Sequence, residues 1–138
     1  MKHSTFLIGL LAAMLSLLSV QTAQAGDKLT ISRASATKSA YQSSYSVSNV
    51  YDGYTSTKYW SSGSQSVGEI VQVTLAETSA IGSVKLYFDT GDQPRAAKIE
   101  YSADGSNWTK AAEFTQSDIV DRVYTCNISG GPLAKHVR

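Results

Sequence analysis

Two segments decide the fold class of this chain, Val71-Gln72-Val73-Thr74-Leu75 and Val84-Lys85-Leu86-Tyr87-Phe88. In each segment an apolar residue stands at every second position, which is the period of a β-strand. The residues between them end in Ile81-Gly82-Ser83, which supplies turn-forming glycine and serine. Each segment therefore predicts a strand with one apolar face inward and one polar face outward.

The same alternation continues along the chain. It recurs at 98–101 and at 124–128, and turn residues gather at 90–94, 103–107 and 130–132. Short strands separated by turns at this spacing predict an antiparallel β-sandwich or barrel. A single helical turn is expected at 48–51, ended by Gly53. Residues 32–46 are rich in Ser, Thr, Ala and Tyr and are interpreted as an ordered surface loop.

The first 25 residues have the pattern of an export signal. Lys2 gives a positive start, an apolar run covers 6–20, and Ala23-Gln24-Ala25 has the small-x-small form of a cleavage site. The apolar run is shorter than the roughly 20 residues that a membrane-spanning helix needs. The sequence thus predicts a signal peptide at 1–25, one domain at 26–138, and a secreted, periplasmic or extracellular protein without membrane insertion.

Charge and histidine content exclude several function classes. Removing residues 1–25 removes one lysine and no acidic residue, so the formal charge falls from +1 to 0. A balanced charge gives no electrostatic reason to bind nucleic acid. His136 is the one histidine that remains, and Cys126 has no partner base nearby in sequence, so no catalytic motif is present and an enzyme is not expected. We interpret Cys126 as a buried thiol.

An oxygen-rich segment lies at 47–62. It combines the carboxylate of Asp52 and the flexibility of Gly53 with several hydroxyl side chains. Oxygen ligands on a tight turn suit a hard cation such as calcium. The alternative is that Asp52 caps its own turn through backbone hydrogen bonds.

Several sequence blocks together resemble a known family. Asp52-Gly53 with Thr57 and Trp60-Ser61-Ser62 is similar to the signature loop of discoidin domains, also called coagulation-factor type C domains, which include the family-32 carbohydrate-binding modules. Further similar blocks follow in the same order at 68–75, 81–86, 99–109 and 134–138. The resemblance covers nearly all of the chain after the signal.

The resemblance implies a fold and a metal site. The fold is an antiparallel jelly-roll β-sandwich with a ligand site in the loops at one end. Calcium ligands carried over by position are the carbonyl of Asn49, the carboxylate of Asp52, the carbonyl of Tyr54 and the hydroxyl of Thr57. Family members continue past Val137-Arg138 into a further strand that commonly gives calcium a glutamate, so we expect a C-terminally truncated domain with an open strand edge, which could pair with other domains or chains.

Sugar sites combine an aromatic face with a few fixed polar groups. Our candidates are Tyr41 as the platform, Asp92 as acceptor and Arg95 as donor, with Ser61 at the position where many galactose-binding relatives carry histidine. Simpler interpretations stay open: Tyr41 and Tyr45 pack on the surface, Asp92 pairs with Arg95, and Trp60 and Trp108 belong to the core.

The sequence therefore predicts a secreted, non-catalytic carbohydrate-binding module for extracellular or cell-wall glycans, with a calcium-stabilised loop. The alternative is an adhesion or protein-interaction module of the discoidin type. The predicted loop tips consist of Ser, Gln, Gly and Asp, and the absence of apolar tips argues against membrane binding.

Overall fold

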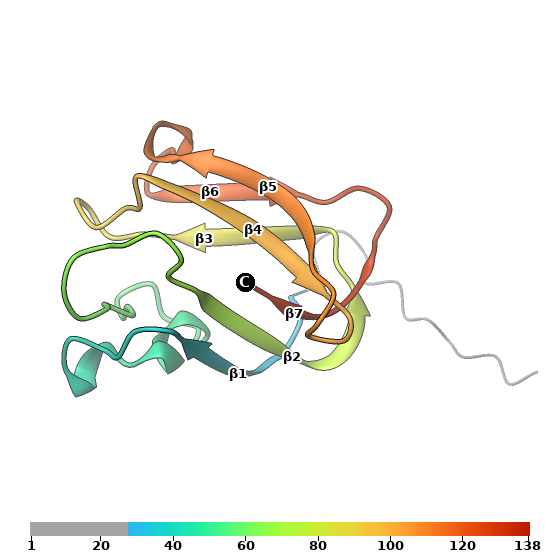
Figure 1. Cartoon of the computed structure of the whole chain (residues 1–138), viewed down its shortest axis with the longest axis horizontal. Coiled ribbons are helices and arrows are strands. Elements are labelled where there is room, and N and C mark those ends of the chain that lie inside the picture. The colour runs from blue at the N-terminus through green and yellow to red at the C-terminus, as the bar shows by residue number, and fades with distance from the viewer. Residues whose placement is uncertain (1–27) are drawn as a thin grey trace, which may run out of the picture.

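The computed structural model describes residues 28–138, and the predicted signal peptide lies outside these residues. The described chain forms two antiparallel sheets packed face to face (Figure 1). The larger sheet has the strand order β1-β2-β7-β4-β5, and the smaller sheet pairs β3 with β6. The predicted antiparallel β-sandwich is confirmed.

The strands β2, β3, β4 and β6 overlap the four segments in which alternation predicts strands, and β2 extends five residues beyond its predicted segment. Seven strands are present in the described residues: β1 Ile31–Ala36, β2 Val71–Ala80, β3 Ser83–Tyr87, β4 Ala96–Ser102, β5 Thr109–Thr115, β6 Val123–Asn127 and β7 Leu133–Val137. The predicted loop at 32–46 is wrong at its start, because residues 32–36 belong to β1. Pairing with β2 stabilises β1 despite its polar composition, and sequence periodicity does not report such pairing.

The short helices are all of the 3₁₀ type. They are η1 Ser43–Tyr45, η2 Val47–Val50 and η3 Gln116–Asp118. The helical turn predicted at 48–51 corresponds to η2, where the hydroxyl of Ser46 accepts a hydrogen bond from the N–H of Ser48. The other two turns were not predicted. No helix within residues 28–138 is long and apolar enough to cross a membrane.

The core lies between the two sheets. One cluster joins Ile99 and Phe114 of the larger sheet to Cys126 of the smaller sheet, and a second contains Leu75, Ile81 and Ala134. Cys126 is buried as predicted, and burial raises the pKa of its thiol. The strand β7 lies in the middle of the larger sheet, between β2 and β4. Within the described residues, the two-stranded sheet leaves the outer edges of β3 and β6 without a strand partner.

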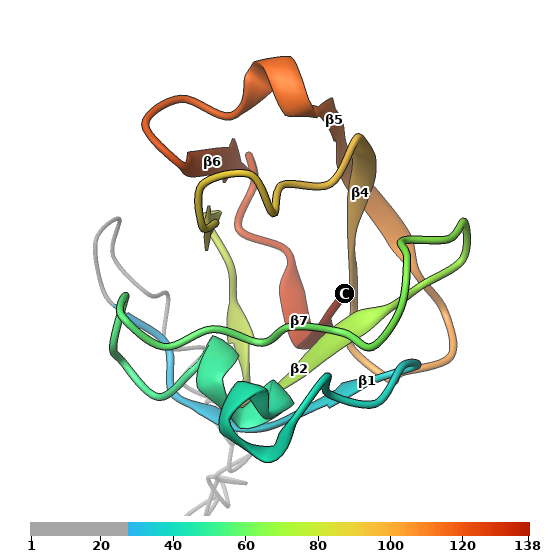
Figure 2. The ribbon, with the colours of Figure 1, turned by 90° about the vertical axis from the view of Figure 1, so that its left-hand side faces the viewer.

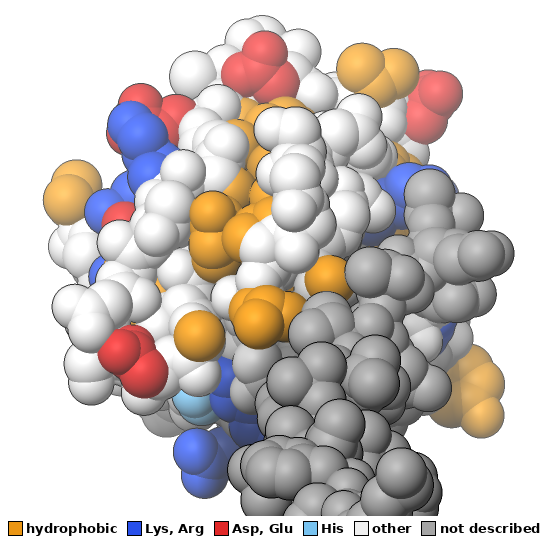
Figure 3. All heavy atoms as spheres, turned by 90° about the vertical axis from the view of Figure 1, so that its right-hand side faces the viewer, with side chains coloured by type: hydrophobic (Ala, Val, Ile, Leu, Met, Phe, Trp, Pro, Cys, Tyr) orange, Lys and Arg blue, Asp and Glu red, His pale blue; other side chains and the backbone are white. Residues whose placement is uncertain are grey.

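The two ends of the sandwich differ. One end carries the β1–β2, β3–β4 and β5–β6 connections (Figure 2). At the opposite end, Figure 3 shows apolar side chains gathered in the middle of the face and charged ones around its margin. The long β1–β2 connection holds η1 and η2, so most of the predicted site residues lie at the first end, which we call the loop end.

Candidate functional site

A short two-stranded ladder organises the loop end. Ala40 pairs with Ser61, the N–H of Tyr41 donates to the carbonyl of Trp60 at 2.8 Å, and the N–H of Ser62 donates to the carbonyl of Ser39 at 2.9 Å. Side chains alternate across such a ladder. Tyr41 and Trp60 therefore share one face, and Ala40 and Ser61 share the other.

The first face carries three aromatic rings. Tyr41 stacks on Trp60 with ring centroids 5.2 Å apart and planes 28° apart, and Tyr45 meets Trp60 edge-on at 5.3 Å. Tyr41 is 61% exposed and Trp60 39% exposed. The interpretation of Trp60 as a core residue is therefore wrong: its neighbours are other loop residues, and its indole faces the surface. Trp108 is half-buried on the β4–β5 turn, against His136 and Arg138.

Lys58 joins this aromatic cluster to the β3–β4 connection. Its Nζ donates to Oδ2 of Asp89 at 2.7 Å and to Oδ2 of Asp92 at 2.9 Å. The same Nζ lies 4.7 Å from the centroid of the Trp60 ring. The hydrogen bonds to Asp89 and Asp92 raise the pKa of Lys58, and the hydrogen bond from Lys58 lowers the pKa of Asp89. The proposed pairing of Asp92 with Arg95 is wrong, because Lys58 takes that place.

The four predicted sugar-site residues are only partly brought together. Tyr41 and Asp92 are linked through Trp60 and Lys58. Ser61 lies on the opposite face of the ladder from Tyr41. Arg95 precedes β4, where its carbonyl accepts a hydrogen bond from the N–H of Gln116 at 3.1 Å. No ion pair of the Arg95 guanidinium is found within residues 28–138.

Sequence reasoning missed Lys58 and did not select Asp89. A signal for Lys58 was available, because it precedes Trp60 by two residues and so shares its face in an extended segment. Its two acidic partners lie 31 and 34 residues further along the chain, so only the fold reveals them.

Three of the four predicted calcium ligands converge in the loop after η2. The N–H of Tyr54 donates to Oδ1 of Asp52 at 2.9 Å, and the hydroxyl of Thr57 donates to Oδ2 of Asp52 at 2.6 Å. The Thr57 hydroxyl also lies 3.1 Å from the carbonyl oxygen of Tyr54. The hydrogen bond from Thr57, followed by that from Tyr54, lowers the pKa of Asp52. Carboxylate, carbonyl and hydroxyl oxygens so close together form a donor set of the kind that calcium takes.

The side chain of Asn49, the fourth predicted ligand, binds backbone carbonyl groups on both sides of this loop. Its amide donates to the carbonyls of Ser44 and Lys58, both at 2.9 Å. Asp52 also caps its turn as the alternative predicted, because its Oδ1 accepts the hydrogen bond from the N–H of Tyr54. No group of three or more His, Cys, Asp and Glu side chains that could hold a metal occurs in the described part of the chain.

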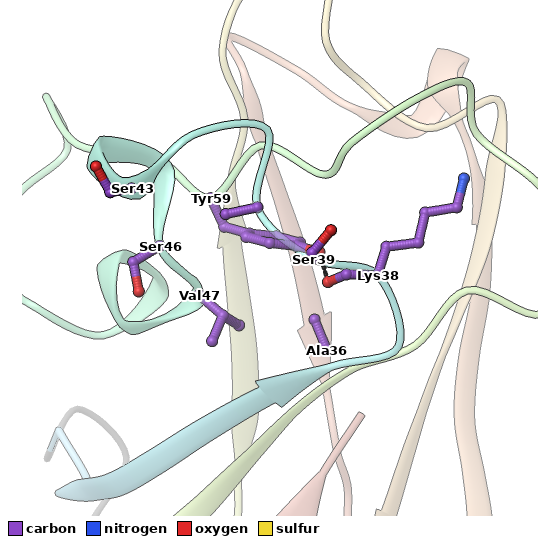
Figure 4. A pocket seen from close by; sticks show the side chains of 8 residues that line it. Ala36, Lys38, Ser39, Ser43, Ser46, Val47 and Tyr59 are labelled. Atoms are coloured by element: carbon purple, nitrogen blue, oxygen red, sulfur yellow. Dashed lines mark hydrogen bonds between the residues drawn. The ribbon is translucent and has the colours of Figure 1, made fainter.

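A shallow hollow of about 380 Å³ lies on the Ala40 side of the ladder, between η1, η2 and the end of β1 (Figure 4). The ring of Tyr59 lies over it, and the Tyr59 hydroxyl donates to the carbonyl of Lys38 at 2.7 Å. Its lining is Ala36, Lys38, Ser39, Ala40, Ser43, Ser46, Val47 and Tyr59.

Two apolar side chains protrude from the β1–β2 connection. Val67 is fully exposed, and Tyr54 is 70% exposed. The expectation of wholly polar loop tips is therefore wrong. Val67 is preceded by Ser and Gln residues and followed by Gly68, so no apolar pattern in the sequence marks it.

Comparison with known proteins now identifies the family. The family model for the F5/8 type C domain matches residues 33–138. The chain belongs to the F5/8 type C domain family. This confirms the resemblance to discoidin domains. No curated protein matches the chain.

Solved structures similar to this F5/8 type C domain include carbohydrate-binding modules. Chitosan-binding module 2 of a chitosanase/glucanase from Paenibacillus sp. IK-5, solved with chitotriose, has a TM-score of 0.65 at 21% identity, over 76% of this chain and 79% of that one. CpGH89CBM32-5 from Clostridium perfringens, solved with GalNAc-β-1,3-galactose, has a TM-score of 0.63 at 18% identity, over 76% and 79%. A pectin-binding module has a TM-score of 0.60 at 23% identity, over 80% and 77%. These likenesses establish a shared sandwich fold.

Proposed function

We propose that this F5/8 type C domain is a non-catalytic carbohydrate-binding module whose site lies at the loop end. The observation that carries the proposal is the exposed Tyr41–Trp60 stack beside the ion-paired Lys58, Asp89 and Asp92. The named ligands of the similar structures support it, because chitosan, pectin and GalNAc-galactose are all carbohydrates.

The geometry suits sugar recognition. The apolar face of a pyranose ring packs against an aromatic ring, and fixed polar groups read its hydroxyls. Both the Lys58 ammonium group and the Tyr41 ring lie against the Trp60 ring. The exposed face of Tyr41 is therefore the aromatic surface that a sugar would contact. Asp89 and Asp92 supply acceptors nearby. One such site has an affinity on the order of millimolar to micromolar, and attached domains or oligomers would raise retention by multivalency.

We further propose a calcium ion in the loop at 49–57. Asp52, Tyr54 and Thr57 would supply three oxygens, and Asn49 would add its carbonyl. The ion would hold this loop in one conformation. Lys58 follows the loop directly, and Trp60 comes two residues later. Calcium thus supports the site by holding its backbone. The predicted signal peptide supports a secreted or periplasmic location.

A second candidate is an adhesion module that binds protein or lipid. The exposed Val67 and Tyr54 side chains at the loop end favour it. Such a module would bind independently of glycans and would lose affinity on Val67→Ser. A glycan-binding module would retain affinity in that variant.

A glycan array probed with the purified protein tests the proposal. We expect binding to at least one glycan class, competition by the free sugar, and loss of binding in Tyr41→Ala. Binding to no glycan, or binding that Tyr41→Ala leaves unchanged, would contradict the proposed site. The melting temperature of the variant serves as a check on its fold.

A further inference from the structure

Lys58 has an unusual position at the loop end. It lies between an aromatic cluster from the β1–β2 connection and two carboxylates from the β3–β4 connection. Its Nζ bonds both Asp89 and Asp92 while lying 4.7 Å from the Trp60 ring centroid and 5.7 Å from that of Tyr45. A single cation thereby fixes two segments that are distant in sequence.

One ammonium group, that of Lys58, lies between the two carboxylates. The hydrogen bond from Lys58, followed by that from the N–H of Thr90, lowers the pKa of Asp89, and the charge of Arg122 acts in the same direction. Arg122 belongs to the β5–β6 connection, and its carbonyl accepts a hydrogen bond from the N–H of Phe88 at 2.8 Å. Lys58 therefore contacts both carboxylates, and the backbone of Arg122 lies beside Phe88, the residue before Asp89. A ligand beside Asp89 and Asp92 therefore meets carboxylates that already share the Lys58 ammonium group.

We propose that Lys58 is a specificity-determining residue that makes the site select uncharged glycans over amine-bearing ones. This inference rests on the proposed carbohydrate-binding function. A protonated sugar amine that approached Asp89 or Asp92 would lie close to the Lys58 ammonium, and like charges at close range disfavour binding. Without Lys58, the same carboxylates would attract the amine.

The alternative is that Lys58 only holds the loops in place. A purely structural role would reduce the affinity for all glycans by the same factor. A charge-based role would change the ratio of affinities between an uncharged sugar and its amine counterpart. This ratio therefore separates specificity from positioning.

The experiment uses matched pairs of immobilised probes: galactose with galactosamine, glucose with glucosamine, and the N-acetyl forms of both amino sugars. Binding is measured at about pH 5, where sugar amines are protonated and most exposed carboxylates are ionised. The proteins are wild type, Lys58→Met, Lys58→Arg and Lys110→Met. Lys110 also forms an exposed ion pair, with Glu113 on β5, and so provides the matched control.

We expect wild type to prefer the uncharged member of each pair that it binds. Lys58→Met should shift the ratio toward the amine by roughly tenfold, whereas Lys58→Arg and Lys110→Met should keep the wild-type ratio. Wild-type preference for amines, or an unchanged ratio in Lys58→Met, would overturn the inference and leave the proposed function standing. Binding of no probe and no array glycan by wild type would instead refute the proposed function, and the inference with it.

Discussion

The rings of Phe114 and Tyr124 stack with their centroids 4.0 Å apart and their planes 15° apart. Phe114 lies on β5 of the larger sheet and Tyr124 on β6 of the smaller one, so this contact joins the two layers. Cys126 and Ile99 belong to the same cluster. The contact lies in the core between the two sheets.

Phe114→Ala should destabilise the domain by about 3–5 kcal/mol, because it removes a buried ring and leaves a cavity between the sheets. Urea denaturation measures the change. Tyr87→Ala is the control, because Tyr87 is exposed on β3 and should cost far less. Equal losses in the two variants would contradict the assignment of Phe114 to the core.

Tyr41→Ala should abolish detectable glycan binding and leave the unfolding transition nearly unchanged. The side chain is exposed, so its removal costs little stability, whereas the sugar would lose its aromatic surface. Tyr87→Ala is again a matched control, because Tyr41 and Tyr87 are both 61% exposed. Calorimetric titration with the best array ligand would compare the three proteins.

Chelation should lower the melting temperature if calcium occupies the loop at 49–57. With calcium at about 100 times its dissociation constant, the shift should be on the order of 10 °C. Asp52→Ala should remove the dependence on chelator. Identical melting curves for the wild type with calcium and with chelator would count against the metal site.

Acid should destabilise the domain partly through Asp104. Its carboxylate accepts hydrogen bonds from the N–H of Asn107, from the Asn107 side chain and from the N–H of Ser106, and these bonds lower its pKa from the ordinary value of 3.8. Because the folded-state pKa is the lower one, this stabilisation is complete above the unfolded-state pKa and is lost as the pH falls toward the folded-state pKa.

Asp104→Asn should therefore flatten the decline in stability below about pH 4. Thermal unfolding as a function of pH measures this slope. Glu113→Gln, a change at an exposed carboxylate on β5, should leave it as in the wild type. An equally steep decline in Asp104→Asn would show that other carboxylates cause the acid sensitivity.

Cys126 should not react with a thiol reagent in the folded protein. It is 4% exposed, and burial raises the pKa of the thiol, so little nucleophilic thiolate forms near neutral pH. Reaction should become complete after unfolding in urea. Rapid labelling under native conditions would contradict the packing of Cys126 between the sheets.

The sequence by itself determined the layered β architecture, because the alternation in segments such as 71–75 and 84–88 is a local property that burial of one face enforces. It also placed the oxygen-rich turn, since Asp52, Tyr54 and Thr57 contact one another within six residues. The alternation of apolar residues did not predict the polar strand β1, because pairing with β2 stabilises this strand.

Only the tertiary structure decided how the loop end is arranged. Trp60 lies at the surface because Tyr41 and Tyr45 reach it from an earlier part of the same connection, and Lys58 meets Asp89 and Asp92 across more than 30 residues. Such contacts depend on which loops the two sheets bring to one end, and no local pattern encodes that choice.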